Sequence, residues 1–480
     1  MSSDNLTPEL LQLLTTEQAW HYSVVPKAAH NGSLELLVDE TRLVAGLAEE
    51  LELLLGKRIV LHHTPPAAVR ELLSRYYLRT NASQAHAQTQ STQLTAQRSD
   101  DFLPALIAEA RHLGSSDIHI EVYEERCRVR IRIDGLLVER YTIGRNDYPP
   151  LINKIKIRAS LDIAEKRLPQ DGRIFFQQDG LRFDIRVSVL PTLHGEKVVL
   201  RLLSNDATRI DIATLGFTDQ QLSDYTEGIR QPHGMLLISG PTGSGKTTTL
   251  YATLKQLNKT TTNILTVEDP IEYTLEGINQ VQLKESIGLT FAAALRTFLR
   301  QDPDVIMLGE IRDGETAQMA VRAALTGHLV LSTIHTNSAW GTISRLADMG
   351  LAPFLVAGTL NTSVAQRLVR LLCPHCSTEE NFDPKFFPRN YRAPRKVHTH
   401  RRAGGCASCH FTGYRGRKAI YEVIPIDHEL AARIRINAPE VNELLAERQI
   451  TTLADNAFRL FESGETSIEE IYPILFNSHT

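Results

Sequence analysis

The sequence predicts an α/β protein whose core is a doubly wound parallel sheet, preceded by a smaller α+β domain with an antiparallel sheet. Two observations carry this prediction. From about Gly234 onward, unbroken apolar and β-branched segments alternate with helical stretches, as expected of parallel strands buried on both faces. Before them, two alternating segments flank Asp134-Gly135, which is a strong short-range signal for a β-hairpin.

The composition is that of an ordinary globular protein. The 480 residues are 42% hydrophobic and 22% charged, and the net charge of -4 gives no global positive field that would point to nucleic acid. No apolar run approaches the ~20 residues of a membrane-spanning helix, and the N-terminus lacks the pattern of a signal peptide. We therefore expect a cytosolic protein that reaches any membrane through a partner.

The N-terminal part of the chain predicts a small α/β domain over residues 1–80. Its expected elements are strands over Leu34–Val38 and Arg58–Leu61 and helices over Pro8–Leu14 and Glu40–Leu55. Residues 81–100 are rich in Ser, Thr, Gln and Ala and hold almost no bulky apolar side chain. Such a composition cannot form a core, so this segment is predicted to be a flexible linker.

Residues 101–206 predict the α+β domain. Its expected elements are a helix over Phe102–Leu113, a strand at Asp117–Ile120, a hairpin over Cys127–Ile143, a second hairpin that turns at Asp179-Gly180, and a strand over Val198–Leu202. Cys127 alternates with arginines along its strand and is expected to be a small buried side chain.

Residues 207–480 predict the doubly wound core, with a cysteine-containing lobe at 370–416 and amphipathic helices at 427–480. The expected strands of the core are Met235–Ile238, Ile264–Val267, Val305–Leu308 and Leu329–Ile334.

A phosphate-binding loop is the most specific motif of the chain. Gly240-Pro-Thr-Gly-Ser-Gly-Lys246-Thr247 fits G-x-x-x-x-G-K-[ST] at every fixed position, between an apolar strand and a helix. Its glycines let backbone N–H groups wrap around phosphate, and Lys246 is expected to contact the β- and γ-phosphates while the Thr247 hydroxyl ligates Mg²⁺. A dinucleotide-binding loop is excluded because that fingerprint has no lysine. The sequence thus predicts ATP and Mg²⁺ as cofactors, bound by Gly240, Pro241, Thr242, Gly243, Ser244, Gly245, Lys246, Thr247 and Thr248.

Acidic residues follow two of the predicted strands, in VEDPIEY with Glu272 and in DPDVIMLGEIRD with Glu310. The carboxyl ends of parallel strands face the ligand crevice of such a sheet. A carboxylate there can hold Mg²⁺ or accept a proton from the attacking water. The alternative is that these acidic residues only cap or form turns, and the Asp-Pro pairs Asp269-Pro270 and Asp302-Pro303 are typical of turns. His335 follows a third strand, where it is expected to approach a γ-phosphate.

In their order and spacing, these motifs resemble those of the GspE/PilB-type secretion and type IV pilus assembly ATPases. The segments that carry the resemblance are GPTGSGKT, VEDPIEY, LRTFLRQDPDVIMLGEIRD, TGHLVLSTIHTNSA, LDIAEKRLPQDGRI, RVSVLPTLHGEKVVLRLL, LVRLLCPHC and GYRGRKAIYEV. The resemblance covers the chain from about Asp101 to the C-terminus. The resemblance implies a homohexamer of RecA-like ATPase domains, each with a preceding small α+β (PAS-like) domain.

The resemblance also implies roles for individual residues. Glu272 is expected to be the general base, and Glu310 to lie near Mg²⁺. His328 and His335 match the family's His box, and Arg186 and Arg201 match arginine fingers of the preceding domain. Residues 1–80 resemble the small domain that docks secretion ATPases onto an inner-membrane platform, and they lack the Arg-Leu-Gly-led pattern of its cyclic-di-GMP-binding variant.

Four cysteines form two C-x₂-C pairs, Cys373 with Cys376 and Cys406 with Cys409. In a cytosolic protein this spacing favours a closed tetrahedral Zn²⁺ site over disulfides or free thiols. His375 and His410 are alternative ligands, but four cysteines are the simpler set. Within the resembled family, assembly-type members carry such a site, which implies pilus extension or secretion.

We therefore expect a cytoplasmic hexameric motor ATPase at the inner membrane that drives type II protein secretion or type IV pilus assembly, without direct contact to nucleic acid. The main alternative is a DNA-translocating motor on the same core, with Arg128, Arg130 and Arg132 as a basic stripe. A scaffold without hydrolysis is a third reading, against which the intact acidic residues and Lys246 argue.

Overall fold

The computed structural model describes residues 10, 13–14, 18–19, 22–30, 33–39, 47–55, 57–66, 68–69, 72–73, 99–178, 180–203, 211–438 and 441–477. Most of the predicted helix Pro8–Leu14, the first part of Glu40–Leu55 and nearly all of the predicted linker 81–100 lie outside them. The chain forms two compact units, Met1–Gln90 and Ser91–Thr480. None of the helices that the structure describes combines the length and apolar character that a membrane crossing requires.

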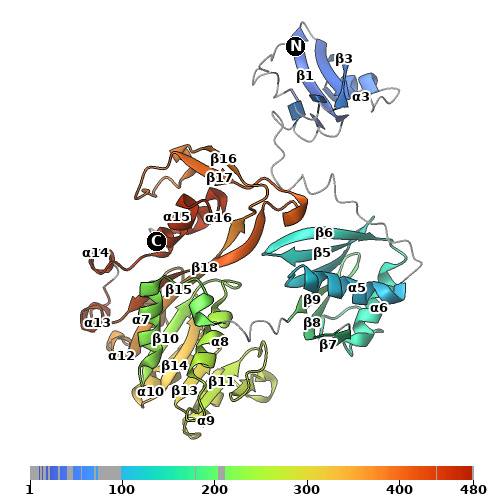
Figure 1. Ribbon diagram of the computed structural model, residues 1–480. Coiled ribbons are helices and arrows are strands. Elements are labelled where there is room, and N and C mark those ends of the chain that lie inside the picture. Colours follow the sequence, from blue (N-terminus) through green and yellow to red (C-terminus); the bar gives the residue numbers. More distant parts are fainter. Residues whose placement is uncertain are drawn as a thin grey trace. The chain divides into compact units, whose positions relative to one another are not determined.

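The first unit contains a three-stranded sheet, in the order β1 (Val24–His30), β2 (Ser33–Asp39), β3 (Arg58–Thr64), with helix α3 (Leu47–Leu55) beside it (Figure 1). β1 is antiparallel to β2, whereas β2 is parallel to β3. Leu34, Leu36 and Val38 alternate along β2 and are fully buried with Leu51 of α3. Both strands predicted for this region are therefore present.

The second unit begins with an α+β domain that has a six-stranded antiparallel sheet, in the order β6-β5-β4-β9-β8-β7. The strands are β4 (Asp117–Val122), β5 (Cys127–Ile133), β6 (Leu136–Ile143), β7 (Gln170–Gln178), β8 (Leu181–Thr192) and β9 (Gly195–Leu202). Helices α5 (Ser99–His112) and α6 (Tyr148–Arg158) share one apolar core with the sheet (Figure 1). Asp134 and Gly135 turn the predicted hairpin with φ angles of 47° and 85°. Cys127 is fully buried in this core, as expected.

A seven-stranded sheet forms the centre of the remaining chain, in the order β12-β11-β13-β14-β10-β15-β18. Its strands are β10 (Gly234–Ser239), β11 (Ile264–Glu268), β12 (Asn279–Gln282), β13 (Val305–Leu308), β14 (Leu329–Ile334), β15 (Leu360–Leu372) and β18 (Tyr414–Pro425). All pairs are parallel except β15 with β18. The four predicted core strands are confirmed. β12, β15 and β18 are additional.

Helices cover both faces of this sheet (Figure 1), as the doubly wound prediction requires. Along β10, Met235 and Leu237 enter one core while Leu236 and Ile238 enter the other. Helices α7 (Asp219–Arg230) and α8 (Lys246–Leu257) pack on the second of these faces. The first face is covered by α9 (Phe291–Phe298), α10 (Gly314–Leu325), α11 (Gly341–Asp348), α12 (Pro353–Thr359), α13 (His428–Arg435), α14 (Asn442–Glu447), α15 (Leu453–Glu462) and α16 (Ile468–Phe476).

The cysteine-containing lobe is inserted between β15 and β18, which pair along most of their length as an antiparallel hairpin. Within the lobe, β16 (Thr378–Asn381) pairs with β17 (Thr399–Arg402). Short 3₁₀ turns complete the second unit at Ile212–Thr214, Glu285–Ile287, Pro384–Phe386 and Ala407–Cys409.

Candidate functional site

The phosphate-binding loop connects the buried strand β10 to helix α8. Gly240, Gly243 and Gly245 have φ angles of 148°, 83° and 89°, which side chains disfavour. A Cβ atom on Gly240 would lie 2.5 Å from the backbone oxygen of Gln366. A Cβ atom on Gly245 would lie 2.8 Å from the side-chain Nε2 atom of Gln366. The glycines are therefore required both by the loop conformation and by its close approach to β15.

Lys246 is the first residue of α8 and is 9% exposed. Its ammonium group donates to the backbone oxygens of Gly240 at 2.7 Å and Pro241 at 3.0 Å. Burial lowers the pKa of Lys246, and the carboxylate of Glu310 acts against that shift. The loop thus holds a cation at the helix N-terminus, where anionic phosphate oxygens are favoured partners.

A cavity of about 550 Å³ lies over this loop and brings most of the predicted site together. The predicted residues that line it are Arg201, Thr242, Gly243, Gly245, Lys246, Thr247, Thr248, Glu272, Glu310 and His335. Gly240, Pro241 and Ser244 belong to the loop but do not line this cavity, and Arg186 lines the neighbouring one. The volume is within the ~300–1,000 Å³ that is usual for small-molecule sites.

Glu310 follows β13 and lies between two nitrogen groups. His335 Nε2 is 3.3 Å from its carboxylate, and Arg312 Nη2 is 2.5 Å from it. Burial opposes ionisation of Glu310, but the hydrogen bonds and charges of Arg312 and His335 outweigh it and hold the pKa below its ordinary value. Glu310 is therefore a carboxylate at neutral pH, as a ligand of Mg²⁺ or of its waters must be.

The two predicted arginine fingers face each other across neighbouring strands, since Arg186 of β8 pairs in register with Arg201 of β9. Arg186 Nη1 is 3.1 Å from the carboxylate of Glu272, and its Nη2 donates to the backbone oxygen of Ile271 at 2.6 Å. Arg201 is 60% exposed and donates from Nε to Asp117 at 3.0 Å. The α+β domain therefore carries positive charge to the predicted base.

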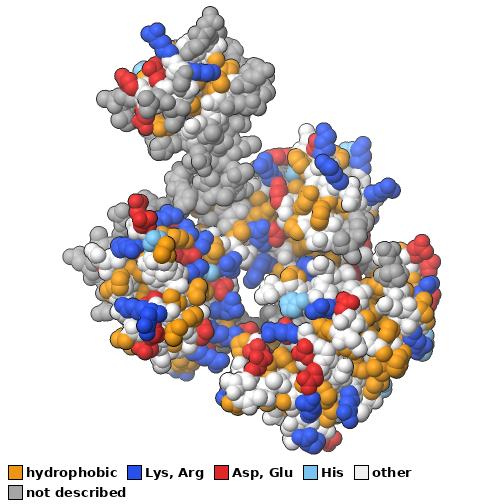
Figure 2. All heavy atoms as spheres, turned by 180° about the vertical axis from the view of Figure 1, so that it is seen from behind, with side chains coloured by type: hydrophobic (Ala, Val, Ile, Leu, Met, Phe, Trp, Pro, Cys, Tyr) orange, Lys and Arg blue, Asp and Glu red, His pale blue; other side chains and the backbone are white. Residues whose placement is uncertain are grey.

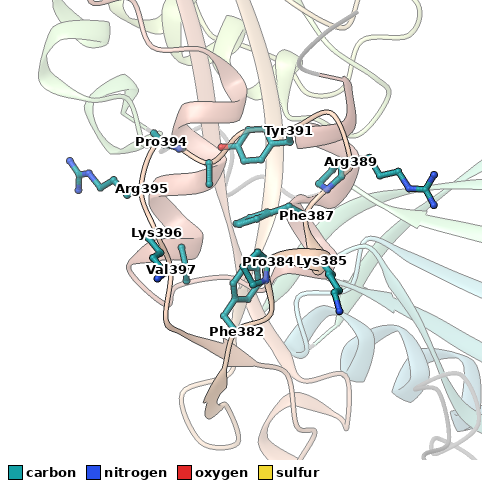
Figure 3. A pocket seen from close by; sticks show the side chains of 12 residues that line it. Phe382, Pro384, Lys385, Phe387, Arg389, Tyr391, Pro394, Arg395, Lys396 and Val397 are labelled. Atoms are coloured by element: carbon teal, nitrogen blue, oxygen red, sulfur yellow. The ribbon is translucent and has the colours of Figure 1, made fainter.

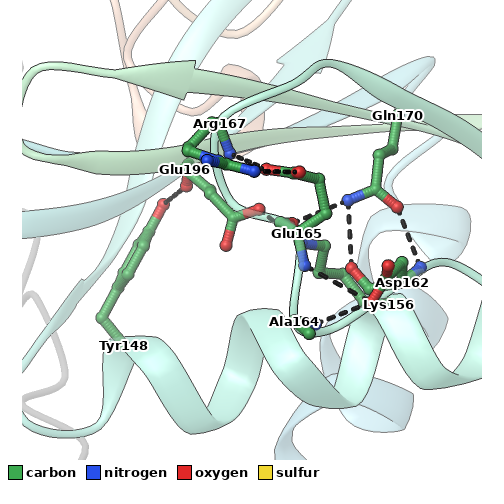
Figure 4. Close-up of polar contacts among 8 residues, drawn as sticks. All are labelled: Tyr148, Lys156, Asp162, Ala164, Glu165, Arg167, Gln170 and Glu196. Atoms are coloured by element: carbon green, nitrogen blue, oxygen red, sulfur yellow. Dashed lines mark hydrogen bonds and ion pairs between the residues drawn. The ribbon is translucent and has the colours of Figure 1, made fainter.

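A buried polar cluster secures the segment that precedes β7 (Figure 4). Lys156 is fully buried and donates to the Glu196 carboxylate at 2.5 Å and to the backbone oxygen of Glu165 at 2.7 Å. The Gln170 side chain also donates to that oxygen at 2.9 Å. Because β7 pairs with β8, this cluster supports the strand that carries Arg186.

The sequence model of the family described as "Type II/IV secretion system protein" matches residues 93–473. The chain belongs to this family. It is therefore an ATPase, and family membership implies that it uses nucleotide and Mg²⁺. A second family model, described as "MshEN domain", matches residues 2–83.

Curated relatives of this secretion-family ATPase come from both pilus and secretion systems. The type IV pilus assembly ATPase PilB of Myxococcus xanthus (strain DK1622) is 43% identical over 493 residues, covering 97% of this chain and 87% of the relative. The type II secretion system protein E of Pseudomonas aeruginosa (strain PAO1) is 49% identical over 372 residues, covering 77% of this chain and 74% of the relative. The predicted family resemblance is thus confirmed.

Solved structures share the fold of this secretion-family ATPase. The crystal structure of the pilus retraction motor PilT with bound ADP is 26% identical, has a TM-score of 0.54, and covers 78% of this chain and 98% of its own. The X-ray structure of the Legionella pneumophila ATPase DotB is 22% identical, has a TM-score of 0.60, and covers 81% of this chain and 97% of its own. The predicted α/β class is confirmed.

The four predicted cysteines of this ATPase meet in one cluster, with all Sγ atoms within 4.8 Å of one another. Sγ–Sγ distances are 3.9 Å for Cys373–Cys406, 3.7 Å for Cys376–Cys409 and 3.8 Å for Cys406–Cys409. Four Zn–S bonds of ~2.3 Å in a tetrahedron place the sulfurs ~3.8 Å apart, so the arrangement fits Zn²⁺. Among the described residues, this ligand group contains neither His375 nor His410.

Gln366, which the sequence analysis missed, braces the phosphate-binding loop from β15. Its side chain is almost fully buried, donates to the backbone oxygen of Ser244 at 2.9 Å, and accepts from the Thr249 hydroxyl at 2.9 Å. A buried amide must be hydrogen-bonded. The sequence carries no local signal for this role, because Gln366 stands in the segment SVAQRLV with two other polar residues, Ser363 and Arg367.

Tyr251 and Glu268, also missed, hold the segment that carries Glu272. The Tyr251 hydroxyl donates to the Glu268 carboxylate and accepts the backbone N–H of Glu272 at 3.3 Å. Glu268 also accepts from Thr266 at 2.7 Å and from Gln280 at 3.1 Å. Burial, and then the charge of Glu268, raise the pKa of Tyr251, so its hydroxyl keeps its proton.

His328 and the arginines of β5 lie outside the cavity lining. His328 stands at the opposite end of β14, and its Nδ1 is 2.9 Å from the backbone oxygen of Ala323, which is a structural role. Arg128 and Arg130 pair with the buried Glu121 at 3.0 Å and 2.8 Å. These arginines are neutralised within their own sheet, which does not favour a DNA-binding stripe.

Proposed function

We propose that this chain is a motor ATPase whose ATP hydrolysis drives type II protein secretion or type IV pilus assembly. The observation that carries the proposal is the cavity in which Lys246, Glu272 and Glu310 meet Arg201 of the preceding domain. The relatives named for type IV pilus assembly and for type II secretion support a function in one of these two systems.

The residues of the cavity divide the chemistry among them. The loop N–H groups and Lys246 bind the β- and γ-phosphates, while the Thr247 hydroxyl and Glu310 hold Mg²⁺, which neutralises phosphate charge when bound. Glu272 accepts the proton of the attacking water. Arg186 and Arg201 offset the charge that develops on the transferring phosphoryl group. His335 orients the Glu310 carboxylate, which it contacts at 3.3 Å.

The proposed setting is a homohexamer on the cytoplasmic side of the inner membrane. Residues 1–80 dock onto a platform protein, 81–100 act as a linker, 101–206 carry the arginine fingers, and 207–480 form the ATPase domain. The lobe at 370–416 binds one Zn²⁺ through Cys373, Cys376, Cys406 and Cys409. The thiolate spacing supports this last assignment.

Two variants test the active site. We expect Lys246→Ala to abolish hydrolysis and weaken ATP binding, because the loop loses its ammonium group.

Glu272→Gln should bind ATP normally but hydrolyse it about 10² to 10⁴ times more slowly, because an amide cannot accept the proton. Lys255→Ala, which removes a charge from the exposed face of the same helix, is the matched control. Wild-type turnover in either site variant would refute the assignment, and strong stimulation of turnover by DNA would favour a DNA motor.

A further inference from the structure

The cysteine-containing lobe holds a second cavity, of about 750 Å³, between Phe382 and Val397 (Figure 3). Its walls are mainly aromatic, proline and aliphatic side chains, namely Phe382, Pro384, Phe387, Pro388, Tyr391, Ala393, Pro394 and Val397. None of these residues lines the phosphate cavity. The described structure thus gives this ATPase an apolar hollow that its hydrolytic chemistry does not use.

The rim of this cavity is uniformly basic. Residues 384–402 contain seven Lys or Arg and no Asp or Glu, in a chain of net charge -4. Four of these cations, Lys385, Arg389, Arg395 and Lys396, line the cavity. Figure 3 shows the guanidinium groups of Arg389 and Arg395 projecting on opposite sides. In the space-filling view, Lys and Arg side chains gather along the outer edge of this lobe (Figure 2).

Few acidic side chains of the described chain pair with these cations. Arg395 is 3.4 Å from Glu462, with both side chains exposed. Lys385, Arg389 and Lys396 have no acidic partner in the described part of the chain. Exposed ion pairs contribute about 0–1 kcal/mol each, so fold stability does not explain why like charges gather here.

The floor of the cavity is built from packed aromatic rings and contains a buried polar group without a partner among the described residues. The Phe382 ring packs against Phe387 with centroids 4.8 Å apart and edge-on against Phe461 at 5.3 Å. The hydroxyl of Tyr391 is buried and has no hydrogen-bond partner among the described residues. Burial raises the pKa of Tyr391, so this hydroxyl remains a donor. A buried donor without an acceptor is unfavourable, so this hydroxyl adds nothing to the stability of the lobe.

We propose that this cavity docks an acidic peptide segment of a partner protein, which inserts one large apolar side chain and sets its carboxylates against the basic rim. Arginine forks match carboxylate geometry, and an aromatic pocket with a charged rim is typical of a binding hot spot. Single-stranded nucleic acid needs open ring faces for stacking, whereas Phe382 and Phe387 are engaged with other rings. The site is independent of the proposed function, because binding requires no nucleotide.

The test uses the full-length protein and a fluorescent peptide of glutamate and serine around one central tryptophan, followed by anisotropy. We expect Arg389→Glu to weaken binding about tenfold, since it replaces an attraction with a repulsion. Arg392→Glu makes the same charge change in the same loop but does not line the cavity, so it should weaken binding clearly less. Ala393→Trp should abolish binding without any charge change, because it fills the hollow. Unchanged ATPase activity in all three variants will show that they fold.

Four outcomes would overturn the proposal. Equal losses for Arg389→Glu and Arg392→Glu would mean diffuse charge attraction. Undiminished binding after the peptide's tryptophan is replaced by alanine would mean that nothing enters the cavity. Preference for an oligo-dT strand or for phosphatidylglycerol vesicles, retained in Ala393→Trp, would assign the rim to nucleic acid or membrane. No detectable peptide binding at low salt would remove the site altogether.

Discussion

At the residue scale, the Tyr251 hydroxyl links a buried carboxylate to the segment of the proposed general base, since it donates to Glu268 and accepts the backbone N–H of Glu272. We expect Tyr251→Phe to lower kcat about tenfold while the KM for ATP stays near wild type, because the base loses its backbone support but the phosphate loop is intact. Tyr225→Phe removes an equally buried hydroxyl, bonded to Thr253 at 2.7 Å. It should reduce stability by about 1 kcal/mol and leave kcat unchanged. Equal losses of kcat in both variants would mean a general packing effect.

The same residues show how far the sequence could predict the site. Lys246, Glu272 and Glu310 belong to motifs whose spacing is fixed by the chemistry, so they were predicted and now meet in one cavity. Gln366 acts on Ser244, which lies 122 residues away in the chain. No local pattern reports such a contact, because it depends on β15 pairing with β10.

At the element scale, the cysteine lobe should depend on metal. We expect one Zn²⁺ per chain, and Cys406→Ser should lose it and make the lobe sensitive to protease, because such sites contribute on the order of 10 kcal/mol to folding. Turnover should fall only indirectly. Cys127→Ser, in the core of the α+β domain, is the control and should keep the zinc. Metal analysis that finds no zinc in protein purified without chelator would refute the assignment.

The sheet of the α+β domain should show an acid-sensitive ion cluster. Burial alone would raise the pKa of Glu121, but Arg130, Lys197 and Arg128 lower it from 4.5 to about 2. The folded state thus binds this proton less readily than the unfolded chain. The stabilisation is complete above about pH 4.5 and is lost as the pH falls toward 2, with a magnitude on the order of 3 kcal/mol. Urea midpoints should lose this pH dependence in Glu121→Gln but keep it in the exposed control Glu124→Gln.

Within the seven-stranded sheet, the four strands that are buried on both faces were predicted, and the two edge strands were missed. β10, β11, β13 and β14 are buried along their whole length, which produces unbroken apolar runs. β12 is a polar edge strand, and β18, on the opposite edge, is exposed at alternate positions of its first half. Edge strands keep polar side chains because their outer edge is exposed to water. Their sequences therefore lack the unbroken apolar run that predicts a central strand.

At the scale of the whole molecule, we expect activity to belong to an assembled ring. Arg201 pairs with Asp117 through Nε, but 60% of its side chain remains exposed, and an arginine must be held firmly in place to stabilise transition-state charge. Neighbouring subunits would supply that restraint. Turnover per chain should therefore rise with protein concentration, and Arg201→Ala subunits mixed with wild type should lower activity more than dilution does. Arg182→Ala, an exposed residue of β8, is the control. Full turnover by a monomer, independent of concentration, would contradict the ring.

The hairpin of β15 and β18 has a consequence for how such a motor can diversify. The four thiolates bring the two ends of residues 377–405 together, and Leu372 remains paired with Tyr414 just below them. The backbone of the sheet therefore does not depend on the length of the enclosed segment, although Phe382 and Phe387 anchor that segment on Phe461 of α15. A longer or shorter loop between the two cysteine pairs would therefore change the outer surface of this lobe while leaving the phosphate-binding loop as it is.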